Sequence, residues 1–283
     1  MKSLRIILII ITLFFIQNGF AQVSKNFKSI EEAMKAPDSV LWLTLNDQKM
    51  IDFPEEILSF KNLRYLDLAG NSLSVLPDAI VELDHLFYFD LSGNPLTKLP
   101  SSFGGLKSLS NLYLDYTGSN HIEGDLKILA QLPMLKVLDL KGDDLKILPS
   151  AIGQLKNLEY LELSNNEIEI LPNELGNLVN LQILYINNDS HFDLQKNIPL
   201  LSGLPKLKEL HLEGDHFKTL PSEIEYLKSL EYLFLANNEI DELPESIKNL
   251  KKLKFIDVSN NRLPHIILDQ YRDDFSPTIK IKF

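Results

Sequence analysis

Apolar and polar residues alternate along most of the chain in a pattern that recurs about every 23 residues. From Leu63 to Leu68 every second residue is apolar, which is typical of a strand with one buried face. From Leu76 to Leu83 the apolar residues stand three apart, and Pro77 opens the segment, which favours a short, tight helix. Each unit therefore predicts one strand, one turn and one short helical segment.

Ten units share this pattern in one register. Seven of the nine intervals between successive unit starts are 23 residues long, and two are 26. The units start at Val40, Leu63, Leu86, Leu109, Leu135, Leu158, Leu181, Leu207, Leu230 and Leu253. Such regularity predicts a repeat protein in which each unit buries its apolar face against its neighbours.

The unit L-P-x-x-I-x-x-L-x-x-L-x-x-L-x-L-x-x-N-x-L resembles the 23-residue type of the leucine-rich repeat family, familiar from Ras-group and plant intracellular members. The resemblance covers residues 40–263. It implies an α/β solenoid, or horseshoe, with a parallel β-sheet on the concave face and short helices or turns on the convex face. Leucine-rich repeat enzymes attach a catalytic domain, for which this chain leaves no room, so we expect no enzyme.

One polar position follows the strand in each unit, as Asn71 does in the second. An asparagine amide there can both donate and accept hydrogen bonds within the turn, so we interpret this column as structural and exclude it from any binding site. An aspartate keeps the acceptor and loses the amide donor. Local deviations are therefore expected in the repeats that carry Thr117, Asp143, Asp189 and Asp215.

The ends of a solenoid expose apolar surface unless caps cover them. Residues 22–39 are expected to form an N-terminal helical cap, in which Ser29 opens a capping box before a short helix over 30–35. Residues 264–283 are expected to form a C-terminal cap, made of a helix and a closing strand over 278–283.

The first 21 residues have the three parts of an export signal. Two cations precede an apolar run over 6–16, and the small residues Gly19 and Ala21 suit cleavage after Ala21. The alternative is a membrane anchor, but this run is much shorter than the about 20 residues that a spanning helix needs. We therefore predict a signal peptide over 1–21 and no membrane span after its removal.

The composition excludes several classes of partner and several kinds of site chemistry. With 28 Lys and Arg against 39 Asp and Glu, the formal net charge is -11, and removal of the signal peptide leaves 26 cations against 39 acids. Nucleic acid and anionic lipid are therefore not expected as partners. The chain has 0 Cys, which excludes disulfides, thiolate metal sites and cysteine nucleophiles. An exported chain without cysteine indicates a bacterial protein that is periplasmic, at the cell surface or secreted.

The two 26-residue units start at Leu109 and Leu181 and lack the Leu-Pro pair at its usual place. Their extra residues fall after the strand, within 116–124 and 187–195. They predict either loops at one edge that carry recognition or a longer helix on the convex side.

Three positions of each strand, at offsets of two, four and six from the unit start, are expected to face the concave side because buried leucines lie between them. Aromatic residues fill six of the ten positions at offset two, and the three columns together hold eight acids and one cation. The candidate ligand-binding residues are Trp42, Tyr65, Asp67, Tyr88, Asp90, Tyr113, Asp139, Tyr160, Glu162, Tyr185, Glu209, His211, Tyr232, Phe234, Phe255 and Asp257.

Two explanations of this face remain open. Acids on adjacent strands repel each other, and aromatic residues within a charged rim are typical of binding surfaces. The alternative is that the aromatic side chains only shield the sheet and pack against one another along it. His211 between Glu209 and Glu213 predicts a polar contact rather than a metal site.

We therefore predict a non-enzymatic module that binds a protein or peptide with basic groups and uses no cofactor, catalytic residue or metal. No metalloprotease, nucleophile-elbow or phosphate-loop motif occurs in the sequence. The alternative partner is a glycan that stacks on the same aromatic row, and a purely structural surface protein would bind neither. Replacing Tyr65, Tyr88 and Asp90 together is expected to abolish binding and leave the melting temperature near wild type.

Overall fold

The computed structural model describes residues 25–114, 121–142, 144–264 and 279–283. The predicted signal peptide, Thr117, Asp143 and the expected C-terminal helix lie outside the described residues. None of the helices in the described ranges is long and apolar enough to cross a membrane.

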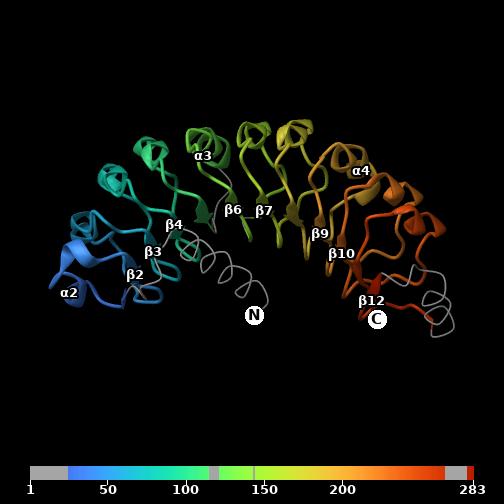
Figure 1. Ribbon diagram of the computed structural model, residues 1–283, viewed down its shortest axis with the longest axis horizontal. Coiled ribbons are helices and arrows are strands. Elements are labelled where there is room, and N and C mark those ends of the chain that lie inside the picture. The colour runs from blue at the N-terminus through green and yellow to red at the C-terminus, as the bar shows by residue number, and fades with distance from the viewer. Residues whose placement is uncertain (1–24, 115–120, 143, 265–278) are drawn as a thin grey trace.

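Within these ranges the chain forms an arc whose strands line the inner side and whose helices lie on the outer side (Figure 1). The strands pair in parallel and in chain order, one per unit, so that Tyr65 lies beside Tyr88. The open sheet confirms the predicted solenoid with a parallel concave sheet. Its strands are β1 (Asn26–Phe27), β2 (Trp42–Thr44), β3 (Tyr65–Asp67), β4 (Tyr88–Asp90), β5 (Asn111–Tyr113), β6 (Val137–Asp139), β7 (Tyr160–Glu162), β8 (Ile183–Tyr185), β9 (Glu209–His211), β10 (Tyr232–Phe234), β11 (Phe255–Asp257) and β12 (Lys280–Lys282).

Short 3-10 helices occupy most of the convex side. In seven units the helix begins directly after a proline, whose fixed φ and missing N–H suit the start of a helix. The 3-10 helices are η1 (Pro37–Ser39), η2 (Glu55–Ser59), η3 (Asp78–Glu82), η4 (Ser101–Gly105), η6 (Ser150–Gln154), η7 (Asn173–Asn177), η8 (Ser222–Tyr226) and η9 (Glu245–Asn249).

The two longer units place α-helices on the convex side instead. They are α3 (Ile122–Leu129) and α4 (Leu194–Ser202), and Figure 1 shows both on the outer rim. Of the two explanations for the extra residues, the longer convex helix is therefore confirmed.

The N-terminal cap contains a short helix, α2 (Ile30–Ala33), which ends earlier than expected. The Ser29 hydroxyl accepts a hydrogen bond from the Glu32 N–H at 3.2 Å, as the capping box predicts, but the Glu32 carboxylate pairs with Lys25 at 2.6 Å instead of reaching back. Met34, which follows the helix, is 44% exposed. At the other end, β12 pairs with β11 as the predicted closing strand.

The column of asparagines ties each turn to the turn before it. Asn71 Oδ1 accepts hydrogen bonds from the N–H groups of Gln48 and Met50, each at 3.0 Å, and its Nδ2 donates to the carbonyls of Leu45 at 2.9 Å and Leu68 at 2.8 Å. The same two kinds of carbonyl accept from the amides of Asn94, Asn166, Asn238 and Asn261. This confirms that the column is structural.

A second constraint at this turn was not identified from the sequence. The residue before the asparagine column has a positive φ, which glycine, asparagine and aspartate adopt at the lowest cost. At Gly70, where φ is 65°, a Cβ would also collide with the side chain of Asp47 in the preceding repeat. The residues with positive φ at this position are Asp47, Gly70, Gly93, Gly142, Asn165, Asn188, Gly214, Asn237 and Asn260.

Aspartate changes the hydrogen bonds of the column, as the sequence predicts. Asp189 accepts from the N–H of Ile168 at 2.7 Å and donates its own N–H to Asp215 Oδ1 at 2.8 Å. Asp215 is 3% exposed, and its Oδ2 has no hydrogen-bond partner. Burial raises the pKa of Asp215 to about 8, so near neutral pH the folded chain retains a proton that the unfolded chain releases.

We expect Asp215→Asn to stabilise the protein, and to do so more at high pH. Because the folded pKa lies above the unfolded one, Asp215 lowers the free energy of unfolding by up to about 1.4 kcal/mol per pH unit between about pH 4 and about pH 8. Asparagine does not titrate and restores the amide donor. Urea denaturation at about pH 5, 7 and 9 measures the difference. The reverse change, Asn238→Asp, should destabilise more at the higher pH, and an equal effect at every pH would contradict this account.

Candidate binding surface

All sixteen residues predicted to bind a ligand lie on β2 to β11, on the concave side of the sheet. Each is buried or half-buried, and none is fully exposed. Tyr88 is 4% exposed and Asp257 is 3% exposed. The structure therefore brings the predicted residues together on one face, and it also packs them tightly against one another.

Four aromatic rings on β2 to β5 form what we call the N-terminal stack. Its ring centroids lie 4.3 Å apart for Trp42 and Tyr65, 4.1 Å for Tyr65 and Tyr88, and 5.1 Å for Tyr88 and Tyr113. The Tyr65 and Tyr88 rings are nearly parallel, with an angle of 8° between their planes. The one-unit register of the sheet places these rings side by side.

Five rings on β7 to β11 form the C-terminal stack: Tyr160, Tyr185, His211, Phe234 and Phe255. The His211 imidazole lies 3.6 Å from the Tyr185 ring and 4.0 Å from the Phe234 ring, with interplanar angles of 11° and 5°. Sequence reasoning treated His211 as a polar contact and missed its place in the stack. The stack moves between offsets two and four from strand to strand, so a single-column pattern does not reveal it.

The two stacks are separated at β6, where Val137 takes the place of a ring. Val137 is 7% exposed and forms a small apolar cluster with Tyr88 and Tyr113, against which Tyr160 also packs. Much of the aromatic row is therefore satisfied by packing along the sheet, which supports the second of the two explanations for these residues. Within the described residues, Tyr232 joins neither stack.

The concave carboxylates have a structural role that the sequence analysis did not identify. Five of them accept a hydrogen bond from the backbone N–H two residues further along, where the strand ends. Part of the cost of burying these acids is thereby offset. The sequence signal is an acid two positions before the small or polar residue that ends the strand. The pairs are Asp67 with Ala69, Asp90 with Ser92, Asp139 with Lys141, Glu162 with Ser164, and Asp257 with Ser259, at 2.9 to 3.0 Å.

In the C-terminal half of the face, positive groups balance the acids. His211 Nε2 lies 2.7 Å from Glu209 Oε1, and His211 Nδ1 lies 3.3 Å from Glu213 Oε2. Burial alone would lower the pKa of His211, but the hydrogen bonds with Glu209 and Glu213 outweigh burial and raise it. Because both ring nitrogens face carboxylates, the geometry favours the charged imidazolium. Asp257 is paired with Lys282 at 2.7 Å.

In the N-terminal half the acids have no such partner. We call Asp67, Asp90, Asp139 and Glu162 the acidic strip. Within the described ranges, none of the four makes an ion pair. Burial raises the pKa of Asp67 to about 6, and burial together with the charge of Glu162 raises the pKa of Asp139 to about 8. Burial also raises the pKa values of Asp90 and Glu162. The acids are thus paired with positive groups at one end of the face, whereas at the other end they form no ion pair within the described residues and burial favours their protonated, neutral form.

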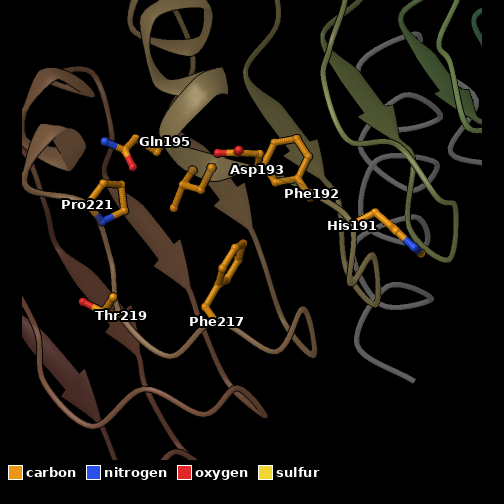
Figure 2. A pocket seen from close by; sticks show the side chains of 8 residues that line it. His191, Phe192, Asp193, Gln195, Phe217, Thr219 and Pro221 are labelled. Carbon is orange, nitrogen blue, oxygen red and sulfur yellow. The ribbon is translucent and has the colours of Figure 1, made fainter.

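A second feature lies on the flank of the arc, outside the predicted face. A hollow of about 400 Å³ lies beside the start of α4. Figure 2 shows Phe217 and Pro221 among the residues that line it. His191 points away from it in this view. Asp193 is already engaged, because it accepts a hydrogen bond from the Lys196 N–H at 3.0 Å and caps α4. Among the described residues, no cluster of His, Cys, Asp and Glu is arranged to hold a metal ion.

Two family models match the chain. The model described as leucine rich repeat matches residues 39–96, 61–122 and 133–190, and the model described as leucine-rich repeat region matches residues 188–270. Together they cover well over half of the sequence. A search of curated protein sequences finds no match.

Several solved structures are similar to this chain. TLR13, solved as a complex with ssRNA13, is 26% identical with a TM-score of 0.65, over 85% of this chain and 40% of that one. The LRR ectodomain of the receptor kinase GASSHO1/SCHENGEN3 from Arabidopsis thaliana, in complex with CASPARIAN STRIP INTEGRITY FACTOR 2, is 30% identical with a TM-score of 0.55, over 78% and 26%. Internalin C2 from Listeria monocytogenes is 27% identical with a TM-score of 0.54, and the match covers 69% of this chain and 80% of the internalin. This chain therefore spans well under half of the first two proteins.

The burial of the N-terminal stack changes one expectation. Tyr88 packs against two rings, and its hydroxyl donates to Asp90 Oδ2 at 3.2 Å. Replacing Tyr65, Tyr88 and Asp90 together would therefore lower the melting temperature, contrary to the expectation from sequence, and loss of binding in that variant would not locate a binding site.

Tyr88→Ala alone is expected to lower the free energy of unfolding by about 3 to 5 kcal/mol, because it leaves a cavity among stacked rings. Tyr226→Ala provides a matched control, because Tyr226 is 51% exposed, and should change the stability by less than about 0.5 kcal/mol. Chemical denaturation of both variants measures the contrast. Similar stabilities for the two variants would contradict the packing described here.

Proposed function

The chain belongs to the leucine-rich repeat family, and we propose that it is a binding module that recognises a protein or peptide with basic groups through its concave face. Members of this family and its structural neighbours are generally binding scaffolds rather than enzymes. The neighbours include a plant receptor ectodomain in complex with CASPARIAN STRIP INTEGRITY FACTOR 2. The proposed residues are those on β2 to β11 described above.

The observation that carries this proposal is the group of concave acids that form no ion pair within the described residues. A sheet that only needed to be shielded from water would not require acids on neighbouring strands, because asparagine or serine can accept the same backbone N–H groups. Asp67 lies beside Asp90, and Asp139 lies beside Glu162, and none of the four forms an ion pair within the described residues. A partner with basic groups would supply the missing positive charge, and its association would be faster at low salt.

The glycan alternative has less support from the geometry. A sugar that stacks on an aromatic side chain needs a free ring face. The faces of Tyr65, Tyr88 and His211 are covered by neighbouring rings at 3.6 to 4.1 Å. The aromatic row therefore presents mostly ring edges to a ligand, which suits side chains of a protein partner better than the flat face of a sugar.

Two further parts of the proposal concern nucleic acid and location. TLR13 was solved with an RNA, so the exclusion of nucleic acid remains a prediction that depends on the net charge of -11. We also propose that the chain acts outside the cytoplasm. The sequence of residues 1–21 and the similarity to a receptor ectodomain and an internalin support this location.

The absence of native cysteines allows one face to be blocked at a time. Ala69→Cys places a thiol at the concave end of β3, and Gln154→Cys places one on exposed convex η6. Each variant is coupled to a large polyethylene glycol maleimide. The unblocked protein is then used to select binders from a displayed random peptide library and from a glycan array.

Selected peptides are expected to bind the Gln154→Cys conjugate and not the Ala69→Cys conjugate, with weaker binding at high salt. Fluorescence anisotropy of labelled peptides measures both effects. Equal binding to the two conjugates would overturn the concave assignment. Selection of glycans only, with binding that is insensitive to salt, would support the carbohydrate alternative instead.

A further inference from the structure

Asn111 is a buried polar residue on the concave side of β5 whose side chain is only partly satisfied. It is 2% exposed and lies between Tyr88 on β4 and Val137 on β6. Its side chain lies close enough to the Tyr113 hydroxyl to oppose the rise that burial causes in the pKa of Tyr113. The carbonyl oxygen Oδ1 is buried and has no hydrogen-bond partner. A buried acceptor without a donor is destabilising, so a ligand that donates a hydrogen bond to it would recover part of that cost.

The same place holds the most crowded part of the acidic strip. The sheet register runs Asp90, Tyr113, Asp139 and Glu162 across β4, β5, β6 and β7. Tyr113, the partner of Asn111, therefore has an acid on either side. Burial, and then the charges of Asp139 and Asp90, raise the pKa of Tyr113 and keep its hydroxyl neutral.

One oxygen of Asp139 remains available. Oδ1 accepts the N–H of Lys141 at 3.0 Å, and within the described residues Oδ2 accepts nothing. The Lys141 side chain is exposed and forms no ion pair with the strip. Asp257 differs, because it forms an ion pair with Lys282 at 2.7 Å. A concave carboxylate of the same kind is thus neutralised there by a lysine of the chain itself.

The break between the two aromatic stacks lies over the same strand. Tyr113 is the last ring of the N-terminal stack and Tyr160 is the first ring of the C-terminal stack, so each has one face without a ring partner in the described chain. Their strands, β5 and β7, are separated by two strand spacings, or about 10 Å. Val137 fills the floor of this gap. Tyr113 is buried, but Tyr160 is half-buried, so a flat cation could contact the accessible part of the Tyr160 ring, which is favourable for a guanidinium group.

We propose that the concave surface over β4 to β7 is a subsite for an arginine side chain of the partner. The Asp139 and Glu162 carboxylates hold the guanidinium group, Asn111 Oδ1 is a further acceptor beneath it, and Tyr113 and Tyr160 flank it. The subsite rests on the proposed function, because it names the basic group that the concave face binds.

A guanidinium group suits this surface better than the other cations do. It presents five N–H donors in one plane, enough for two neighbouring carboxylates and an amide oxygen, whereas an ammonium group presents three. It is also more weakly hydrated and so enters a half-buried site more easily. A divalent metal ion would need a converging set of ligands, and the described residues contain no such set.

The test uses blocked tripeptides, Ac-Gly-Arg-Gly-NH2 and the same peptide with citrulline, which keeps the shape and lacks the charge. Calcium chloride provides the metal arm. Nuclear magnetic resonance titration of the full protein follows the side-chain amide signal of Asn111. The arginine peptide is expected to shift this signal saturably, whereas citrulline and calcium leave it in place.

The variant Asp139→Asn with Glu162→Gln keeps the oxygens that accept backbone N–H groups and removes two adjacent charges, so it should fold at least as stably as wild type. It is expected to bind the arginine peptide about tenfold or more weakly, because each substitution removes a hydrogen bond between charged groups. The control Glu55→Gln with Glu174→Gln removes the same charge from exposed convex positions and should stay within about twofold of wild type. Equal weakening in both variants, or shifts by citrulline or calcium alone, would overturn the subsite.

The two proposals can fail separately. A library peptide that binds the concave face without any basic residue would support the proposed function and overturn the arginine subsite. Conversely, if the arginine peptide binds at Asn111 but no library peptide or glycan depends on the concave face, the subsite is supported and the proposed function is overturned.

Discussion

The hydrogen bonds of the buried asparagine column are the interaction on which the rest of this structure depends. Each amide, such as that of Asn71, links backbone groups of its own turn to those of the preceding turn. Because the units that carry an asparagine bond to their neighbours in the same way, the strands align with a constant register, and residues at equal offsets lie side by side along the arc. The residue before each asparagine must then adopt a left-handed conformation, which limits that position to glycine, asparagine and aspartate.

A constant register has opposite consequences for aromatic and acidic residues. Rings at the same height stack on one another and bury their faces, as Tyr65 and Tyr88 do. Carboxylates at the same height repel each other, and the chain resolves this repulsion in only part of the sheet. His211 and Lys282 form ion pairs toward the C-terminal end, whereas the strip from Asp67 to Glu162 forms none among the described residues, although the charge of Lys141 acts on Asp139 and Glu162. The concave face is therefore uniform in shape and asymmetric in charge.

Much of the fold and part of the candidate site could be predicted from the sequence, because the same apolar pattern recurs in every unit and each repeat gives an independent indication of the same structure. The period placed the ten strands from β2 to β11, although not β1 in the N-terminal cap, and the offsets placed all sixteen candidate residues on one face. The sequence could not show how deeply Tyr88 is buried or that His211 joins a stack, since both depend on side chains from neighbouring strands. The interaction of Asp139 with the N–H two residues ahead also depends on how the strand ends, which the alternation of apolar residues does not describe.

The sequence by itself determined the repeat, the direction of the sheet and the identity of the residues on its concave side, because these follow from spacing along the chain. Only the tertiary structure decided which of those residues pack, form hydrogen bonds or balance charge with one another, and which do not. Val137 interrupts the rings, and Asn111 keeps an acceptor without a donor, at the place where the acids are most crowded. The physical reason is that hydrogen bonding and charge balance depend on distances between side chains of different repeats, and those distances exist only once the solenoid has formed.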